Sequence, residues 1–112
     1  MIISETNPGP ARVIALKGGV DDDSAAQVRR RLEEILSRAG RKARLILDLG
    51  EADRLSAQGI RMILFLAREV NRLDGRLVVC GLSPNAADMF EASRLSDLVP
   101  ICPDRKAALR EF

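Results

Sequence analysis

Two short apolar segments begin the chain, Ile2–Glu5 and Ala11–Leu16. The segment Asn7–Pro10 between them contains two prolines and a glycine, which are residues typical of a turn. We therefore predict that the two segments pair as a β-hairpin. Gly18-Gly19 is expected to end the second strand, because glycine weakens the interior of a strand.

Helical periodicity follows the hairpin. Ser24 and Gln27 form a capping-box pattern, in which a serine at the N-cap is followed by glutamine at the third helical position. Apolar residues then recur at helical spacing as far as Gly40, which is expected to end the helix. The next run, Leu45–Leu49, is apolar on both faces up to Asp48, as in a central strand that is covered on both sides.

The second half of the chain continues this alternation. The remaining predicted elements are a helix at Ala57–Leu73, a strand at Arg76–Cys80, a helix that begins at Ser83-Pro84, a short strand at Leu98–Ile101 and a terminal helix opened by Pro103. The predicted order is β-β-α-β-α-β-α-β-α. Because strands and helices alternate after the hairpin, we predict an α/β fold in one domain spanning residues 1–112, with helices packed on a small mixed sheet that is mostly parallel.

Composition restricts the function more than the fold. The chain has 112 residues, of which 46% are hydrophobic and 30% are charged, and this fits one ordinary globular core. A net charge of +2 is too small to indicate a polyanionic partner, and 3% aromatic residues are few for the base stacking of single-strand binders. Histidine, the commonest general base and metal ligand, is absent. We therefore expect no nucleic acid partner, no enzyme activity, no cofactor and no metal.

Cysteine usage and hydropathy indicate the compartment. Cys80 and Cys102 stand far apart in the sequence, and two reduced structural cysteines are favoured over a disulfide. No N-terminal signal pattern is present, and the longest apolar cluster, Ile60–Ala67, is interrupted by Arg61. We therefore expect a cytoplasmic protein that does not insert into a membrane.

Two charged runs are interpreted as solvated surface. Asp21–Asp23 suits the N-terminal end of the first helix, because consecutive carboxylates do not easily converge on one metal ion. Asp21 has a second interpretation, as part of a rim that binds a partner. Arg29–Arg31 is followed at helical spacing by Glu33 and Glu34, so ion pairing on an exposed helix face explains much of the basic run.

The strongest functional signal is the part of the Ala57–Leu73 helix that follows Gly59. Its predicted core stripe consists of Ile60, Ile63, Leu64, Ala67 and Val70. Met62 and Phe65 lie beyond this stripe, so they are either buried by a neighbouring element or exposed to a partner. Phe65 shares a second stripe with Arg61, Arg68 and Arg72. An apolar ring bordered by arginines is typical of a protein interface.

Several segments agree in order and spacing with one family pattern. They are the turn Gly18-Gly19-Val20-Asp21, the strand end Leu47-Asp48-Leu49, the turn Ser56–Gly59, the run Leu77–Pro84 and the segment from Met89-Phe90 to Leu95. Together they resemble the STAS domain family, which includes the bacterial anti-sigma factor antagonists. The resemblance spans nearly the whole chain. It implies partner switching, in which an unphosphorylated antagonist binds a kinase-like anti-sigma factor and frees a sigma factor, until the kinase phosphorylates a serine at the helix start.

The sequence departs from the family at that turn. Matched without gaps, Ser56 takes the aspartate position, Ala57 takes the phosphoacceptor serine position, and Gly59 matches. Ala57 has no hydroxyl and cannot be phosphorylated, whereas Ser56 is either a substitute acceptor or the cap of the helix. Two interpretations follow: an antagonist no longer controlled by this phosphorylation, or a cytosolic accessory subunit of an ABC-type lipid transporter. A competing class is a STAS domain that binds a nucleotide or another small ligand, because the helix N-terminus offers an anion site.

We predict a non-catalytic protein-interaction module. Its partner is expected to be an anti-sigma factor and serine kinase of the histidine-kinase-like ATPase type, or else transporter subunits. The residues expected to touch this partner are Asp21, Ser56, Ala57, Gln58, Gly59, Arg61, Met62 and Phe65. Phe65 is expected to anchor the apolar contact. The sequence leaves both a monomer and a homodimer open.

Overall fold

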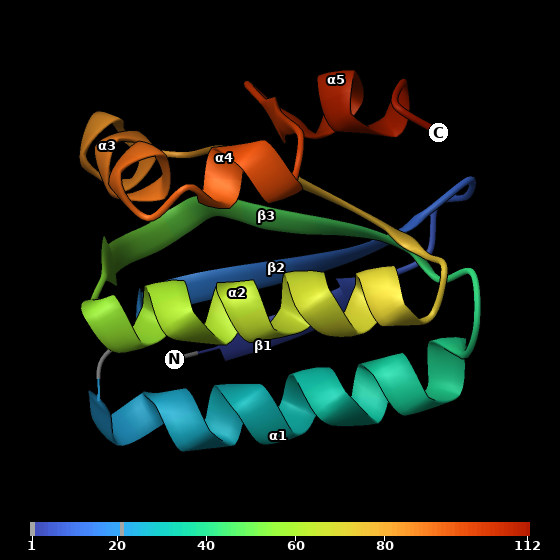
Figure 1. Cartoon of the computed structure of the whole chain (residues 1–112), viewed down its shortest axis with the longest axis horizontal. Coiled ribbons are helices and arrows are strands. Elements are labelled where there is room, and N and C mark those ends of the chain that lie inside the picture. Colours follow the sequence, from blue (N-terminus) through green and yellow to red (C-terminus); the bar gives the residue numbers. More distant parts are fainter. Residues whose placement is uncertain (1, 21) are drawn as a thin grey trace.

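A computed structural model describes residues 2–20 and 22–112, which form a five-stranded sheet with helices on both of its faces (Figure 1). The elements in chain order are β1 (Ile2–Thr6), β2 (Arg12–Val20), α1 (Asp22–Ala39), β3 (Arg44–Leu55), α2 (Ala57–Arg72), β4 (Arg76–Cys80), α3 (Pro84–Ala92), α4 (Leu95–Leu98), β5 (Ile101–Cys102) and α5 (Arg105–Leu109). The α/β class predicted from the sequence is therefore confirmed.

The strands lie in the sheet in the order in which they occur in the chain. β1 pairs antiparallel with β2, which confirms the predicted hairpin, and β2, β3, β4 and β5 are parallel to one another. In such a sheet the carboxyl ends of the parallel strands meet at one edge. This edge lies on the left of Figure 1, where β3 leads into α2 and where α3 is also found.

The main core lies between one face of the sheet and the helices α1 and α2, which run side by side (Figure 1), and it also includes Phe90 of α3 and Leu95 of α4. Its fully buried side chains include Leu32 and Ile35 of α1, Ile63 and Leu66 of α2, and Ile14, Leu16, Leu45 and Leu47 of the strands. The other face of the sheet holds a smaller cluster that includes Val13, Ile46, Val78 and Ala108, the last of which belongs to α5. Because both faces of β3 are buried, its first half is apolar at consecutive positions, as predicted.

Two strands run further than predicted. β2 continues through Gly18-Gly19 to Val20, and β3 continues past Leu49 to Leu55. The two extensions pair with each other across register shifts, as Val20 does with Leu55. The predicted strand ends were wrong because this pairing satisfies backbone N–H and C=O groups that an open loop would leave to water.

The start of α1 and the start of the last strand also differ from the prediction. α1 begins at Asp22, so Ser24 lies within its first turn instead of at the N-cap, and the Ser24 hydroxyl donates to a backbone carbonyl of β2 at 3.5 Å. Leu98 ends the short helix α4 and does not begin a strand, and Leu95 anchors this turn in the core with 0% of its surface exposed. The last strand therefore begins only at Ile101.

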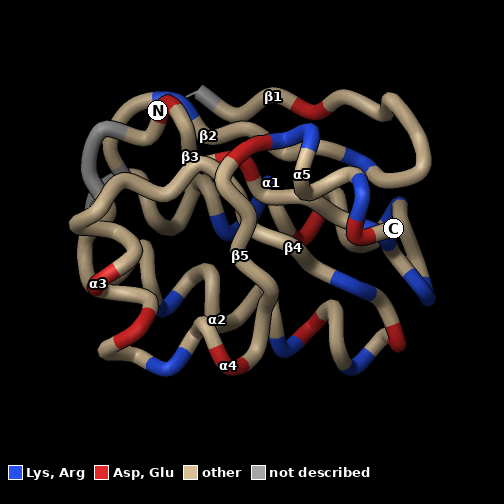
Figure 2. The backbone as a smooth tube through the Cα atoms, turned by 90° about the horizontal axis from the view of Figure 1, so that it is seen from above, with Lys and Arg blue, Asp and Glu red and all other residues tan. Residues whose placement is uncertain are grey.

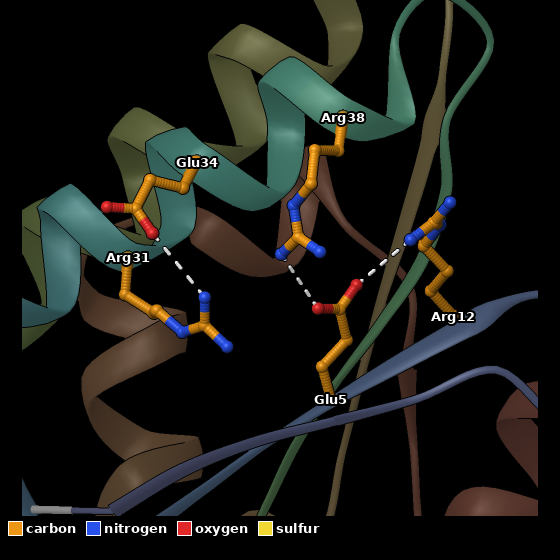
Figure 3. A network of polar contacts seen from close by, with 5 residues as sticks. All are labelled: Glu5, Arg12, Arg31, Glu34 and Arg38. Carbon is orange, nitrogen blue, oxygen red and sulfur yellow. Dashed lines mark hydrogen bonds and ion pairs between the residues drawn. The ribbon is translucent and has the colours of Figure 1, made fainter.

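One carboxylate ties the hairpin to α1 (Figure 3). Glu5 of β1 accepts hydrogen bonds from Arg12 Nη1 of β2 at 3.0 Å and from Arg38 Nη2 of α1 at 2.9 Å. Burial by itself raises the pKa of Glu5, but the hydrogen bonds and charges of the two guanidinium groups outweigh this effect and leave the pKa below its usual value. Arg31 and Glu34 form a separate, solvent-facing pair in the same view.

Candidate functional site

The candidate site lies where the parallel strands end and where β3 passes through Ser56 into α2 (Figure 1). Ser56 has an extended backbone, with φ −78° and ψ 172°, and its Oγ accepts a hydrogen bond from the Gly59 N–H at 3.2 Å. This is the geometry of an N-cap. The capping role predicted for Ser56 is therefore confirmed.

The turn presents its residues to solvent to different degrees. Ala57, the first residue of α2, is exposed, Ser56 and Gln58 are half-buried, and Gly59 is buried. The first turn of α2 contains no acidic residue. The partial positive charge of the helix N-terminus is therefore not offset by a carboxylate within that turn. Ala57 places a small apolar contact beside this charge.

Three residues of α2 that were expected to touch a partner lie in different environments. Arg61 is exposed, whereas Phe65 is half-buried beneath Arg29, whose guanidinium carbon lies 4.1 Å from the ring centroid. Met62 exposes only 4% of its surface and belongs to the main core. The expectation that Met62 faces a partner is corrected, because the start of α1 lies along this side of α2. Leu64, which was expected in the core, is half-buried instead.

Asp21, the remaining predicted contact residue, lies outside the described residues, so its role stays a prediction. Among the side chains that the structure describes, no group of three or more from His, Cys, Asp and Glu could hold a metal ion. Within the described residues, none of the helices has the length and apolar character needed to cross a membrane.

A groove that the sequence did not predict opens beside the turn. Its volume is about 810 Å³, and it is lined by Leu49, Ala52 and Leu55 of β3 and by residues 83–86, 88 and 89 at and near the start of α3. One wall of the groove exists because β3 continues as far as Leu55. No local signal in the sequence marks this groove, since the extension of β3 depends on its pairing with β2.

Asp48 and Cys80 both serve the packing of the C-terminal segment. Asp48 Oδ1 accepts a hydrogen bond from the Gly50 N–H at 2.8 Å, and Oδ2 accepts one from Arg105 Nε at 2.6 Å, which fastens α5 to the sheet. Burial, assisted by the Asp48 carboxylate, raises the pKa of the Cys80 thiol to about 12. Cys102 lies beside it on β5, and both thiols are free. Because the thiolate is the reactive form, Cys80 is poorly suited to act as a nucleophile.

Charged residues of both signs are spread around the molecule (Figure 2). The helices carry local ion pairs between Arg29 and Glu33 at 3.2 Å, Arg31 and Glu34 at 3.4 Å, and Arg72 and Glu69 at 2.8 Å. The predicted pairing of the Arg29–Arg31 run with glutamates of its own helix is therefore confirmed for two of its arginines.

Comparisons with known proteins agree on the fold. The model of the family described as "STAS domain" matches residues 1–108. BtrV of Bordetella bronchiseptica, named as a candidate anti-sigma factor antagonist, is 32% identical over 100 residues, which are 89% of this chain and 84% of that protein. A crystal structure of a Thermotoga maritima protein described in the same way has a TM-score of 0.88 at 10% identity and covers 97% of this chain and 92% of that one. The phosphorylated form of SpoIIAA from Bacillus has a TM-score of 0.75 at 19% identity, with 99% and 100% covered.

Proposed function

Because the chain belongs to the STAS domain family, we propose that it is an anti-sigma factor antagonist that works in a partner-switching system. Its partner is an anti-sigma factor of the histidine-kinase-like ATPase type. The relative from Bordetella bronchiseptica supports this proposal, since the two proteins match over most of their lengths. The role is one of binding and not of catalysis.

The proposed contact area lies around the turn between β3 and α2, and we call it the docking surface. It consists of Ser56, Ala57, Gln58, Gly59, Arg61 and Phe65, and Asp21, which lies outside the described residues, is proposed as a further contact. Ala57 and Arg61 are its exposed members among the described residues. The uncompensated N-terminus of α2 and the Arg61 guanidinium make this area attractive to polar and acidic groups.

One observation carries the proposal: an exposed alanine follows a serine whose hydroxyl already caps the helix. A phosphoryl group at the first residue of α2 would add almost two negative charges and three acceptor oxygens to the docking surface. Ala57 has no oxygen that could receive this group. Modification of Ser56 would disturb the hydrogen bond that it accepts from Gly59. The protein therefore binds its partner without being released by phosphorylation at this turn.

The test is affinity capture from the native host with the wild type and with Ala57→Ser, followed by mass spectrometry and mapping of phosphorylated residues. We expect a histidine-kinase-like ATPase among the captured proteins, and phosphate on the serine introduced at position 57. Ala92→Ser is the matched control, because it places a hydroxyl at an exposed position of α3 outside the docking surface. It should capture the same ATPase and remain unmodified there.

Transporter subunits among the captured proteins, with no phosphate on either variant, would refute the proposal. They would instead identify the chain as an accessory subunit of a transporter. If the ATPase is captured but Ala57→Ser carries no phosphate, the assignment of the partner stands. The idea that position 57 has lost a regulatory phosphorylation site is then refuted.

A further inference from the structure

A groove between α1 and α2 consists of two hollows with volumes of about 390 and 560 Å³. Arg29 lines both, so its side chain stands where the hollows meet. Its guanidinium carbon lies 4.1 Å from the centroid of the Phe65 ring, and its Nε donates to Glu33 at 3.2 Å. The smaller hollow begins at Gln58 and Arg61 of the docking surface, and the larger one reaches the C-terminal ends of both helices. We call the two hollows together the interhelical groove.

The lining of the interhelical groove combines apolar surface with arginine. Its apolar lining is formed by the half-buried Phe65 and Leu73 and by Ala25 and Ala26, while the almost fully buried Leu36 and Met62 lie at its floor. Its charged members are Arg29, Arg41, Arg61 and Arg72 against Glu33 and Glu69. The groove therefore carries an excess of positive charge around an apolar floor.

The arginines of the groove are available to a partner. Arg72 pairs with Glu69 in a bond that leaves 68% of the Arg72 side chain exposed, and Arg41 pairs with Asp74 with the same exposure. Arg61 forms no ion pair with any of the side chains that the structure describes. Solvent-exposed pairs contribute little to stability, because water and salt screen them. The arginines can therefore turn to new carboxylates without a large loss of stability.

We propose that the interhelical groove binds an acidic amphipathic helix of the protein's partner. The apolar face of this helix packs on Phe65 and Leu73, and its carboxylates pair with the groove arginines. A helix laid into a groove is a recurrent mode of protein recognition. When the helix binds, the Arg29 side chain moves away from the Phe65 ring, and the two hollows become continuous. The Arg29 guanidinium group then pairs with a carboxylate of the helix. The inference rests on the proposed function, because the groove starts at the docking surface.

Glu33 and Glu69 favour a protein partner over a nucleic acid. A phosphate backbone carries negative charge at every nucleotide and would meet repulsion from both glutamates. An acidic helix can instead place its carboxylates opposite the arginines and its apolar side chains over the floor, since side chains three and four residues apart share one face.

The first test uses the purified protein and a synthetic peptide of about 18 residues, or five helical turns, with leucine on one face and glutamate on the other. Amide signals of the isotope-labelled protein are followed by NMR during the titration. We expect shifts centred on Arg29, Phe65 and Leu73, weaker at high salt, and none there with a peptide in which lysine replaces glutamate.

Charge reversal supplies the matched controls. The double variant Arg41→Glu and Arg72→Glu changes residues of the groove that lie outside the docking surface. It should raise the dissociation constant of the acidic peptide roughly tenfold or more. The double variant Lys106→Glu and Arg110→Glu changes exposed residues at α5, on the opposite face of the sheet, and should leave binding unchanged. Absence of shifts in the groove, or equal shifts with the lysine peptide, overturns the proposal. Displacement of the acidic peptide by a single-stranded oligonucleotide also overturns it, because the groove would then be a nucleic acid site.

The second test uses the anti-sigma factor captured by the wild type. Arg41→Lys and Arg72→Lys keep the positive charge and introduce amines, which a carbodiimide joins to carboxylates in direct contact. We expect cross-links to Asp or Glu residues of one partner helix, and none from the control Arg110→Lys.

The outcomes separate the two proposals. If Ala57→Glu abolishes binding while the groove variants bind normally and give no cross-link, the proposed function stands and the inference about the groove is overturned. If no anti-sigma factor binds the wild type, the proposed function fails. The peptide titration alone then tests whether the groove binds an acidic helix.

Discussion

Gly81 follows β4 where this strand approaches β3, and Gly81→Ala is expected to destabilise the fold strongly. The φ of Gly81 is +77°, a left-handed conformation that costs an L-residue about 1–2 kcal/mol. An added Cβ would lie 2.7 Å from the nitrogen and 2.8 Å from the Cα of Gly50, both of which are backbone atoms. Relief of this contact by movement of the strands costs about 1–3 kcal/mol more. The sum of roughly 2–5 kcal/mol is a large part of the 5–15 kcal/mol by which domains are stable.

Two other glycines separate the two contributions. Gly40 has φ +72° with nothing within 4 Å of an added Cβ, so Gly40→Ala measures the conformational cost alone. Gly75 is not left-handed, but its added Cβ would meet the Ala43 carbonyl oxygen at 2.5 Å, so Gly75→Ala measures the steric cost alone.

Urea denaturation followed by circular dichroism gives the free energy of unfolding of each variant. Gly81→Ala should lose more stability than Gly40→Ala, and the excess should be comparable to the loss in Gly75→Ala. If Gly81→Ala loses no more than Gly40→Ala, β3 and β4 can separate freely at Gly50, and the reasoning from their close approach is wrong.

Three side chains supply the remaining predictions. Phe65→Asp should abolish binding of the anti-sigma factor in a calorimetric titration, because the ring lies half-buried at the edge of the docking surface. The circular dichroism spectrum of this variant should stay native. An unfolded variant would show instead that the ring is needed in the core. Because the pKa of Glu5 is lowered on folding, its stabilisation is present above the unfolded pKa and is lost as pH falls through the folded pKa. Between about pH 6 and pH 3 the urea midpoint should therefore fall further for the wild type than for Glu5→Gln, and parallel curves would contradict the arginine contacts. Cys102 should be alkylated well before the buried Cys80 in the native protein, as measured by mass spectrometry, and equal rates would contradict the burial of Cys80.

Local chemistry was sufficient to predict where the chain turns, but not how far the strands extend. The prolines of Asn7–Pro10 and the left-handed Gly40 act within a few residues, and the hairpin and the end of α1 agree with the prediction. Residues 50–55 contain Glu51, a polar residue typical of a loop, yet they continue β3 because β2 runs beside them. Because β2 is remote from these residues in the sequence, no local pattern predicts that β3 continues through them.

In the candidate site, too, local contacts could be predicted from the sequence, whereas packing between remote elements could not. Ser56 was predictable as a cap, because the hydrogen bond to Gly59 joins residues three positions apart. Met62 and Phe65 are both apolar residues on one helix, and the packing of α1 against α2 alone decides that the first is buried and the second is half-exposed.

The strand order has a consequence for synthesis of the chain. Each strand pairs with the one that precedes it, so the sheet can grow outward from the hairpin as the ribosome delivers each new element. Pairing between strands that follow one another in the chain keeps the loops to be closed shorter than pairing between distant strands would. α5 is the last of the described elements to emerge, and it covers the apolar cluster around Val13, Ile46 and Val78. A nascent chain therefore carries an uncovered sheet face until α5 has emerged from the ribosome and folded onto it.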